Sequence, residues 1–470
     1  MPDINKDSQF TRVTDLVDTD IITGVRAPDG AASSIAVTTR NLGNYIRALG
    51  PDYTVNDIGV MGGPGAGVGI CPGPLPARMA PIAGTTVRGH DEFGNYMFSE
   101  GSILCWIPAF FFKYGTGANG FAVNIVSIRP RSAYTTVADA NAAGYALHRA
   151  FYDNGERDGF FIDKYLPSNN GGIASSLKNG LPLSSALAHN PFSGLTGAPV
   201  DAYYGSIAAA KTRDATFFPA SHFQRAALAL LALAHAQAST STAWNAWYDA
   251  AGITNYPKGC NNNALGDAND ASLTFVSDGY PNCAKAGSAN LFARTTHNGQ
   301  NCGVADLNGN LWEISPGLTV NSDATPQYYV LKTTERMKDR TAGAGGGATD
   351  LWGTAAQLLA QGYELLGATY GALLASSTAK TYGNAAQVLS EATAGLAWQA
   401  AGLGIPLVGG VGGTNAFGND VLYDYRPASV CPVAGGDWGY GAAAGVWALD
   451  LSGVRGSSVS SVGFRAALYL

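Results

Sequence analysis

The sequence predicts an α+β fold with one long buried helix, short strands and extensive loops. Residues 221–238, SHFQRAALALLALAHAQA, have the length and apolar content of a helix, with Ser221 as its cap. Residues 103–112, ILCWIPAFFF, and 159–165, GFFIDKY, are short apolar runs typical of buried strands. The 61 glycines and 22 prolines among 470 residues indicate many turns.

The N-terminal residues 1–50 are predicted to form a small separate element for assembly or attachment. Apolar residues between Leu42 and Leu49 follow helical spacing, and Gly50 with Pro51 ends that helix. Residues 51–101 are rich in glycine and proline and are predicted to be a connector. Their glycines match neither a dinucleotide-binding fingerprint nor a P-loop, so we expect no nucleotide site there.

The remaining chain, residues 102–470, is predicted to form the main domain. Within it, 137–152 have the composition of a helix, 166–215 read as long loops, and 255–310 are dominated by turn-forming Asn, Asp and Gly. Residues of about 318–425, with Gly clusters and Ala-rich stretches, are predicted to be an insertion. The chain ends in VGFRAALYL, an apolar strand that must be docked inside a sheet, since exposure would favour aggregation.

Composition excludes several classes of protein. Charged residues make up 13% of the chain and hydrophobic residues 46%, so disorder is not expected. A net charge of −6 argues against a general nucleic-acid binder. The most apolar run, Ala226–Ala234, is too short to span a membrane. The opening MPDINKDSQF lacks the features of a secretory signal, which favours a phage or prophage product over a secreted one.

No pattern of catalytic or metal-binding residues stands out. The six cysteines form no CxxC pair, and the chain has no HExxH or GxSxG motif. We therefore expect no metal, no cofactor, no catalytic residues and no enzymatic activity. Buried free thiols are the favoured state of the cysteines, with disulfides as the alternative. His222 and His235 are expected to be packing or surface residues of the long helix.

Six segments carry a more specific signal when they are read in chain order. They are CWIPAF (105–110), GFFIDKY (159–165), FQRAA (223–227), NGNLWE (308–313), GGDW (435–438) and GFR (463–465). In this order they resemble the formylglycine-generating-enzyme branch of the C-type lectin fold. The chemistry of the residues agrees with framework roles: Trp312 supplies a large buried surface, and Glu313 accepts a hydrogen bond from a backbone amide or from an arginine such as Arg465. Only Cys431 lies near the C-terminus, whereas the enzymes of that branch need two cysteines there.

The segment 435–465 resembles the variable region of proteins diversified by retroelements, some of which set the host range of bacteriophages. The matching framework positions are Gly435, Gly436, Trp438, Gly441, Ala444, Gly445, Val446, Ala448, Leu449, Leu451, Arg455, Val462, Gly463, Phe464 and Arg465. The positions that the resemblance makes variable, and therefore ligand-binding, are Gly439, Tyr440, Ala443, Trp447, Asp450, Ser452, Gly453, Ser457, Val459, Ser460 and Ser461.

The residue types at the variable positions fit this mechanism of diversification, which changes adenines copied from a template. An AAC codon altered at its two adenines can encode Gly, Tyr, Ala, Asp, Ser or Val, and every variable position except Trp447 holds one of these. Trp447 falls where the pattern usually has an aromatic residue. Tyr440 and Trp447 are the expected binding hot spots, because aromatic anchors dominate interface energies.

The resemblance implies a receptor-binding protein at the tip of a phage tail fibre. Its expected partners are a host-cell surface receptor, either protein or glycan, two further copies of itself in a homotrimer, and other virion tail components. We expect no nucleic-acid partner and no membrane span. The alternatives are a bacterial surface-displayed ligand-binding protein of the same fold and an oxidoreductase of the formylglycine-generating type. A tailspike depolymerase is a weaker option, because its paired carboxylates, such as Asp306 and Glu313, cannot be paired from sequence.

Overall fold

A computed structural model describes most of the main domain. The described residues are 55–195, 199, 201–250, 255–341, 352–366, 379–381, 393–405, 417, 419–423 and 427–470. The N-terminal element and its predicted helix lie outside them. The described chain mixes six sheets with five α-helices, so the predicted α+β class is confirmed.

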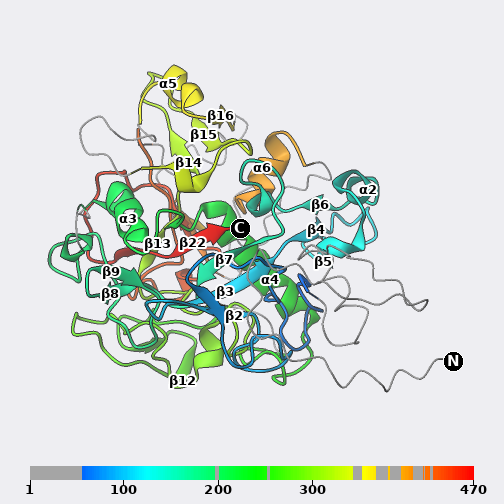
Figure 1. Cartoon of the computed structure of the whole chain (residues 1–470), viewed down its shortest axis with the longest axis horizontal. Coiled ribbons are helices and arrows are strands. Elements are labelled where there is room, and N and C mark those ends of the chain that lie inside the picture. Colours follow the sequence, from blue (N-terminus) through cyan, green and yellow to red (C-terminus); the bar gives the residue numbers. More distant parts are fainter. Residues whose placement is uncertain are drawn as a thin grey trace, which may run out of the picture.

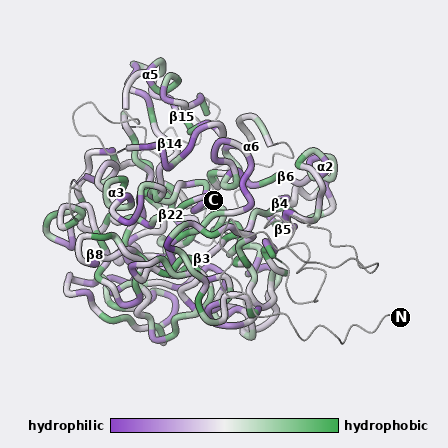
Figure 2. Tube along the Cα trace, viewed as in Figure 1, coloured by the Kyte–Doolittle hydropathy of each residue, from purple (hydrophilic) through white to green (hydrophobic). Residues whose placement is uncertain are grey.

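A six-stranded antiparallel sheet runs through the middle of the molecule (Figure 1). Its strands, in spatial order, are β1 (Met79–Pro81), β2 (Asn95–Phe98), β3 (Ile103–Pro108), β7 (Gly159–Asp163), β22 (Ala466–Tyr469) and β10 (Phe218–Pro219). The final strand β22 therefore lies between two others and leaves no free edge, as the sequence predicts. The tube around β3 is largely hydrophobic (Figure 2), and every residue of β3 after Ile103 is buried.

A second six-stranded sheet holds the C-terminal region. Its spatial order is β17 (Ala379–Thr381), β18 (Val421–Tyr423), β20 (Leu449–Asp450), β19 (Val433–Ala434), β13 (Trp312–Ile314) and β21 (Val462–Phe464). β21 pairs in parallel with β13, and only Arg465 separates β21 from β22 of the first sheet. The two sheets are therefore joined directly at Arg465.

Smaller elements surround these sheets. The remaining strands are β4 (Phe110–Tyr114), β5 (Val126–Pro130), β6 (Ala146–Leu147), β8 (Ser168–Asn170), β9 (Ile173–Ser175), β11 (Gly266–Asp267), β12 (Asp270–Thr274), β14 (Leu318–Val320), β15 (Tyr328–Leu331) and β16 (Tyr363–Leu365). The α-helices are α2 (Val137–Ala142), α3 (Ala202–Lys211), α4 (His222–Ala238), α5 (Ala355–Ala360) and α6 (Leu396–Gly402). None of the helices within the described ranges has the length and apolar content to cross a bilayer.

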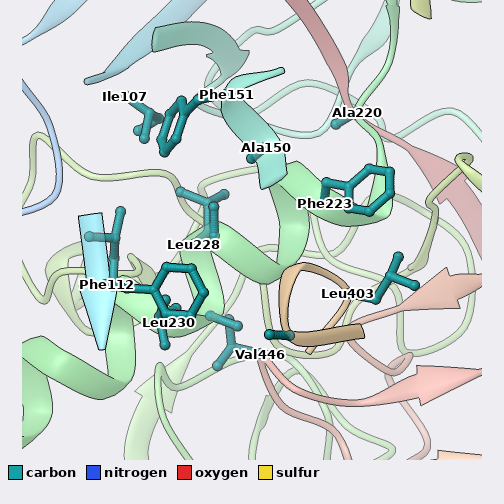
Figure 3. Packing of buried hydrophobic residues seen from close by; sticks show 14 of the residues in the cluster. Ile107, Phe112, Ala150, Phe151, Ala220, Phe223, Leu228, Leu230, Leu403 and Val446 are labelled. Carbon is teal, nitrogen blue, oxygen red and sulfur yellow. The ribbon is translucent and has the colours of Figure 1, made fainter. Parts of the chain in front are cut away.

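The long helix α4 is the centre of the main hydrophobic core and confirms the prediction for 221–238. Ser221 and Gln224 form a reciprocal capping box at its start. Every residue from His222 to Ala236 is buried, which is the pattern of a helix surrounded by other elements. Leu228 and Leu230 of α4 lie among apolar side chains from several other segments (Figure 3).

Two predicted elements are wrong in extent. The apolar run 103–112 is not one strand, because the chain leaves the central sheet at Ala109 and continues as β4 in another sheet. The predicted helix 137–152 ends at Ala142, because Gly144 follows with a φ of +77° and breaks the helical path. Its remainder forms β6 and a short 3-10 turn, Arg149–Phe151.

Three loop-like regions also contain structure that the sequence analysis missed. Residues 166–215 include α3, which Asp201 caps by accepting from the Tyr204 and Gly205 amides. The predicted connector contributes β1 and β2 to the central sheet from its described part, so that part belongs to the folded body. The predicted insertion supplies β18 to the second sheet, and the indole N–H of its buried Trp398 donates to the Leu147 carbonyl (3.0 Å).

His148 provides a test of this core by pH. Its ring lies among Phe110, Phe112 and Phe151, and its Nδ1 accepts from the Ala150 amide (3.1 Å). Burial, and secondarily the charge of Arg149, lower the pKa of His148 to about 3. The neutral ring therefore stabilises the fold fully above pH 6.5, and this contribution is lost as the pH falls from there toward 3.

We expect the variant His148→Asn, which keeps a cap acceptor but cannot titrate, to change this pH dependence. Below about pH 6.5 the wild type should lose unfolding free energy relative to the variant by up to about 1.4 kcal/mol per pH unit. Urea unfolding of both proteins between pH 8 and 4 measures the difference. Parallel curves over that range would contradict the buried neutral histidine.

Candidate functional site

The positions predicted to vary lie in the segment between β19 and β20, at the end of β20 and in the loop after it, and nearly all of them reach solvent. Gly439, Ser452 and Val459 are exposed. Seven others are half-buried, namely Tyr440, Ala443, Asp450, Gly453, Ser457, Ser460 and Ser461. We call these ten residues the variable surface.

The predicted framework positions show the opposite distribution. Thirteen of the fifteen are buried, and the two others, Trp438 and Gly441, are half-buried. Space is tight at several of them: a Cβ atom added to Gly445 would lie 2.0 Å from the Asp420 carboxylate. Framework and variable positions alternate along residues 435–465. The fold nevertheless buries most of the framework positions and leaves most of the variable positions in contact with solvent.

Trp447 does not belong to the variable surface, so its prediction as a binding hot spot is wrong. Its side chain is 4% exposed, and its ring meets Phe417 edge-on at a centroid distance of 5.1 Å. Its backbone amide donates to the Asp420 carboxylate (2.8 Å). Trp447 lies only three residues from the half-buried Asp450 and five from the exposed Ser452, and only the fold shows that its ring points into the core.

Tyr440 is the aromatic member of the variable surface. Its ring contacts Trp312 edge-on at 4.8 Å and Tyr423 at 6.1 Å. Partial burial, and then the nearby Tyr423 and Asp450, raise the pKa of Tyr440, so the phenol stays neutral at physiological pH. Tyr440 is therefore held on one side by framework residues while its other side reaches solvent.

The second loop of the surface is held through its backbone. The Ser185 hydroxyl donates to the Val459 carbonyl (3.0 Å) and accepts from the Val459 amide (2.9 Å). The Ala202 amide donates to the Ser457 carbonyl (2.8 Å), and the His189 ring contacts the Ser460 carbonyl (2.6 Å). Because these bonds use main-chain atoms, the loop can keep its path when the side chains at 457, 459 and 460 change.

A buried ion cluster lies beneath the surface, where the two main sheets join. Arg465 donates to Glu313 through Nε (3.0 Å) and Nη2 (3.1 Å), and Arg225 donates to Glu313 through Nη1 (3.0 Å). The predicted pairing of Glu313 with Arg465 is confirmed. Gly435 is required beside it, since an added Cβ would lie 2.4 Å from Arg225 Nη2.

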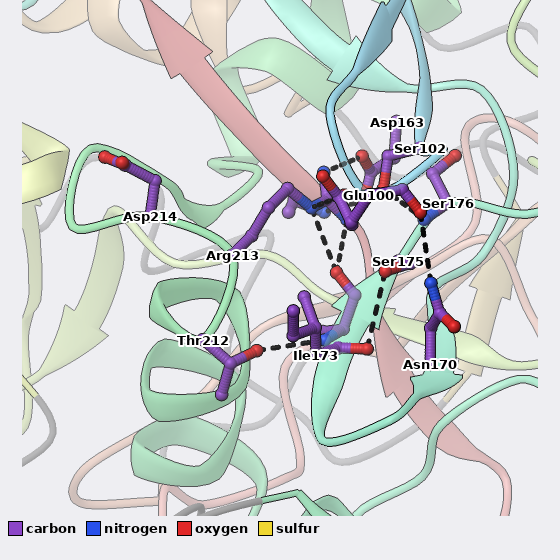
Figure 4. A network of polar contacts seen from close by, with 12 residues as sticks. Glu100, Ser102, Asp163, Asn170, Ile173, Ser175, Ser176, Thr212, Arg213 and Asp214 are labelled. Carbon is purple, nitrogen blue, oxygen red and sulfur yellow. Dashed lines mark hydrogen bonds and ion pairs between the residues drawn. The ribbon is translucent and has the colours of Figure 1, made fainter. Parts of the chain in front are cut away.

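A second buried pair attaches the end of α3 to the central sheet (Figure 4). Arg213 donates to the Asp163 carboxylate (2.5 Å) and to the Ala174 carbonyl (2.6 Å). Asp163 also accepts from the Ala466 amide of β22 (3.0 Å). The aspartate of the GFFIDKY motif therefore joins β7, β22 and α3, which is a structural role.

Several residues next to the variable surface carry no signal in the sequence. Leu187 lies two residues from Ser185, whose hydroxyl binds the Val459 backbone, and is 72% exposed. Tyr423 contacts Tyr440 from a strand that the sequence analysis assigned to an insertion. Neither could be found without the fold, because both come close to the variable positions only through tertiary contacts.

The other predicted residues have structural environments. All six cysteines lie in the described part of the chain, and each is a buried thiol outside any disulfide, as predicted. His222 and His235 are buried, and His235 accepts from the Gly62 amide at Nδ1 (3.0 Å). Asp306 accepts from the Gly287 amide (2.7 Å), and burial raises its pKa to about 6.

Comparison with known proteins adds no assignment. No protein-family model matches the sequence, and no curated protein matches it.

Proposed function

We propose that this chain is a ligand-binding protein whose C-terminal loops form a binding surface diversified by a retroelement. The observation that carries the proposal is the separation of the two sets of positions. Ten of the eleven residues assigned as variable reach solvent, whereas thirteen of the fifteen assigned as framework are buried. The residues of the types that an altered AAC codon allows, at the positions assigned as variable, therefore all reach solvent.

The finer fold assignment, a C-type lectin domain of the formylglycine-generating-enzyme type, is part of this proposal. Its support is the convergence of the six motif segments. β3 and β7 are neighbours in the central sheet, and Arg225, Glu313 and Arg465 form one ion cluster that Gly435 adjoins. Motifs scattered over 360 residues thus meet in one framework, as expected if the resemblance reflects a shared core.

The chemistry of the surface suits binding to varied partners. Tyr440 supplies rigid aromatic area, while serine and glycine supply adaptable polar contacts. Leu187 and Val459, which are 72% and 42% exposed, add apolar area beside them. We propose a host-cell surface receptor as the ligand and the tip of a phage tail fibre as the location, with a homotrimer raising affinity through several linked sites.

The DNA downstream of the gene tests the diversification directly. We expect a near-copy of the codons for residues 435–465 and a neighbouring reverse-transcriptase gene. The copy should differ from the gene only where it carries adenine, and those codons should be the ones for the variable surface. A gene without such a copy, or a copy that differs at framework codons, contradicts the proposal.

A matched pair of substitutions tests whether the surface tolerates change. Val459→Asp is expected to alter the free energy of unfolding by less than about 1 kcal/mol, because Val459 is 42% exposed. Val446→Asp introduces the same charge at a residue that is 3% exposed and is expected to prevent stable folding. Thermal unfolding followed by circular dichroism compares them, and equal destabilisation would contradict the division into surface and framework.

A further inference from the structure

Three potential metal ligands from distant parts of the chain meet beside the variable surface. The ligand atoms of His189, Asp278 and Cys283 all lie within 4.8 Å of one another. The His189 and Asp278 side chains are 2% and 0% exposed, and Cys283 is fully buried. From the sequence we expect no metal, because it has no HExxH or CxxC motif, and the 89 positions between His189 and Asp278 give no local signal of this site.

The contacts of His189 leave a place for a proton or a metal ion on its Nε2 side. Nδ1 lies 2.6 Å from the Ser460 carbonyl oxygen, which can only accept, so Nδ1 carries a proton. In a neutral ring this leaves a lone pair on Nε2, yet Nε2 lies 2.6 Å from the Asp278 carboxylate. A lone pair and a carboxylate repel each other unless a proton or a metal ion lies between them.

Neighbouring residues hold the His189 and Asp278 side chains in fixed orientations, as is usual for metal ligands. Metal-binding histidines usually donate their second ring N–H to a carbonyl or carboxylate, as His189 does to Ser460. Asp278 is held in place by the Asn190 side-chain amide (3.2 Å) and the Tyr280 backbone amide (2.8 Å). The Tyr280 ring stacks on the imidazole at 4.2 Å and shields it from water.

The three ligands lie close to a cavity at the protein surface. Asn190, whose amide contacts Asp278, also lines a surface cavity of about 800 Å³. Asn190 therefore connects this cavity with the aspartate. The ligands are therefore buried but close to solvent.

We propose that His189 Nε2, Asp278 and Cys283 Sγ bind a divalent transition-metal ion, with zinc as the expected metal. Zinc takes this mixture of nitrogen, oxygen and thiolate ligands in tetrahedral geometry, and a water completes the fourth position. Tetrahedral zinc separates its ligand atoms by about 3.3–3.7 Å. The His189–Asp278 contact must open by less than about 1 Å, and the sulfur must move inward by at most about 1.5 Å.

Binding of a metal ion at this site displaces protons from its ligands. Burial and the neighbouring Asp278 raise the pKa of the Cys283 thiol, so without metal it keeps its proton. Zinc binding releases this thiol proton and the proton shared by His189 and Asp278 to the buffer, and the sulfur becomes a thiolate ligand. The metal also fixes the imidazole that contacts the Ser460 carbonyl, so it anchors one loop of the variable surface. The proposal stands independently of the ligand-binding function.

Cobalt titration of the full chain, after treatment with a chelator, tests the site. We expect one Co²⁺ ion to bind with the visible bands of tetrahedral coordination and a thiolate-to-cobalt charge-transfer band, and Zn²⁺ to displace it. The thermal midpoint should rise by several degrees with excess Zn²⁺. A wild-type spectrum without thiolate charge transfer overturns the proposal, whether or not any variant folds.

Variants identify the ligands. Cys283→Ser should abolish the charge-transfer band, and His189→Gln should weaken binding by more than about 100-fold, beyond the effect of losing an outer-shell partner. The matched controls are Cys71→Ser at another buried thiol and His90→Gln at an exposed histidine, and both should bind as the wild type does. Retention of the wild-type affinity and spectrum by Cys283→Ser, or their loss in the controls, overturns the assignment.

Discussion

Replacing Glu313 with glutamine is expected to destabilise the protein by about 3–5 kcal/mol, the cost of breaking a buried ion pair by removing one partner. Glu313 is the shared acceptor of Arg225 and Arg465, and the three side chains are 3%, 2% and 0% exposed. In the variant two guanidinium groups stay buried without an anion between them. The glutamine NH₂ group would also face arginine donors.

The size of this effect follows from the position of the cluster. Arg465 joins the two main sheets, and its remaining donors go to the Asp163 carbonyl (2.8 Å) and the Ala305 carbonyl (2.7 Å). It cannot turn to solvent without breaking these bonds. The loss should therefore appear as lower global stability of the domain.

Urea unfolding followed by tryptophan fluorescence measures this loss. The matched control is Glu156→Gln, since Glu156 pairs with Arg131 at 3.2 Å but its side chain is 46% exposed. Exposed pairs contribute about 0–1 kcal/mol, so the control should remain close to the wild type. Equal effects of the two substitutions would contradict a framework role for Glu313.

Replacing Trp447 with alanine is expected to cost about 3–5 kcal/mol of stability, the range for large aromatic residues removed from cores. The ring packs against Phe417, and its Cζ3 atom lies 2.9 Å from where a Cβ on Gly404 would stand. Removal leaves a cavity between α6 and the second sheet. This result separates a core residue from a binding hot spot, because a hot spot on the surface would leave stability unchanged.

Two controls accompany this substitution. Trp244→Ala removes a tryptophan that is 41% exposed, and Tyr440→Ala removes the half-buried aromatic residue of the variable surface. Both should cost less than Trp447→Ala in thermal and urea unfolding. If Trp447→Ala unfolds at the wild-type midpoint, the tryptophan is not part of the core.

The sequence predicts the elements whose burial is uniform along the chain. Residues 221–238 are apolar on every side of a helix, and a continuous apolar run of that length has few other ways to be buried. The strand 159–163 and the terminal strand 466–469 follow the same logic. The pairing of Glu313 with Arg465 was also predictable, because a buried carboxylate needs a cation.

The sequence-based predictions fail where a local pattern of residues is compatible with two different backbone structures. Residues 137–152 have a helical composition, but Gly144 redirects the chain after six helical residues. Residues 79–98 look like a connector, yet β2 is stabilised by pairing with β3 and β1 by pairing with β2. In both cases the deciding interaction comes from a partner outside the local window.

The sequence by itself determined the α+β class, the buried helix, the buried thiols and the residue types of the C-terminal loops. Only the tertiary structure decided which of those loop residues face solvent, why Trp447 does not, and how His189, Asp278 and Cys283 come together. The reason is physical: composition and periodicity report local backbone preference and average burial. The direction of a side chain in an irregular loop, and contacts across many residues, depend on how the whole chain packs.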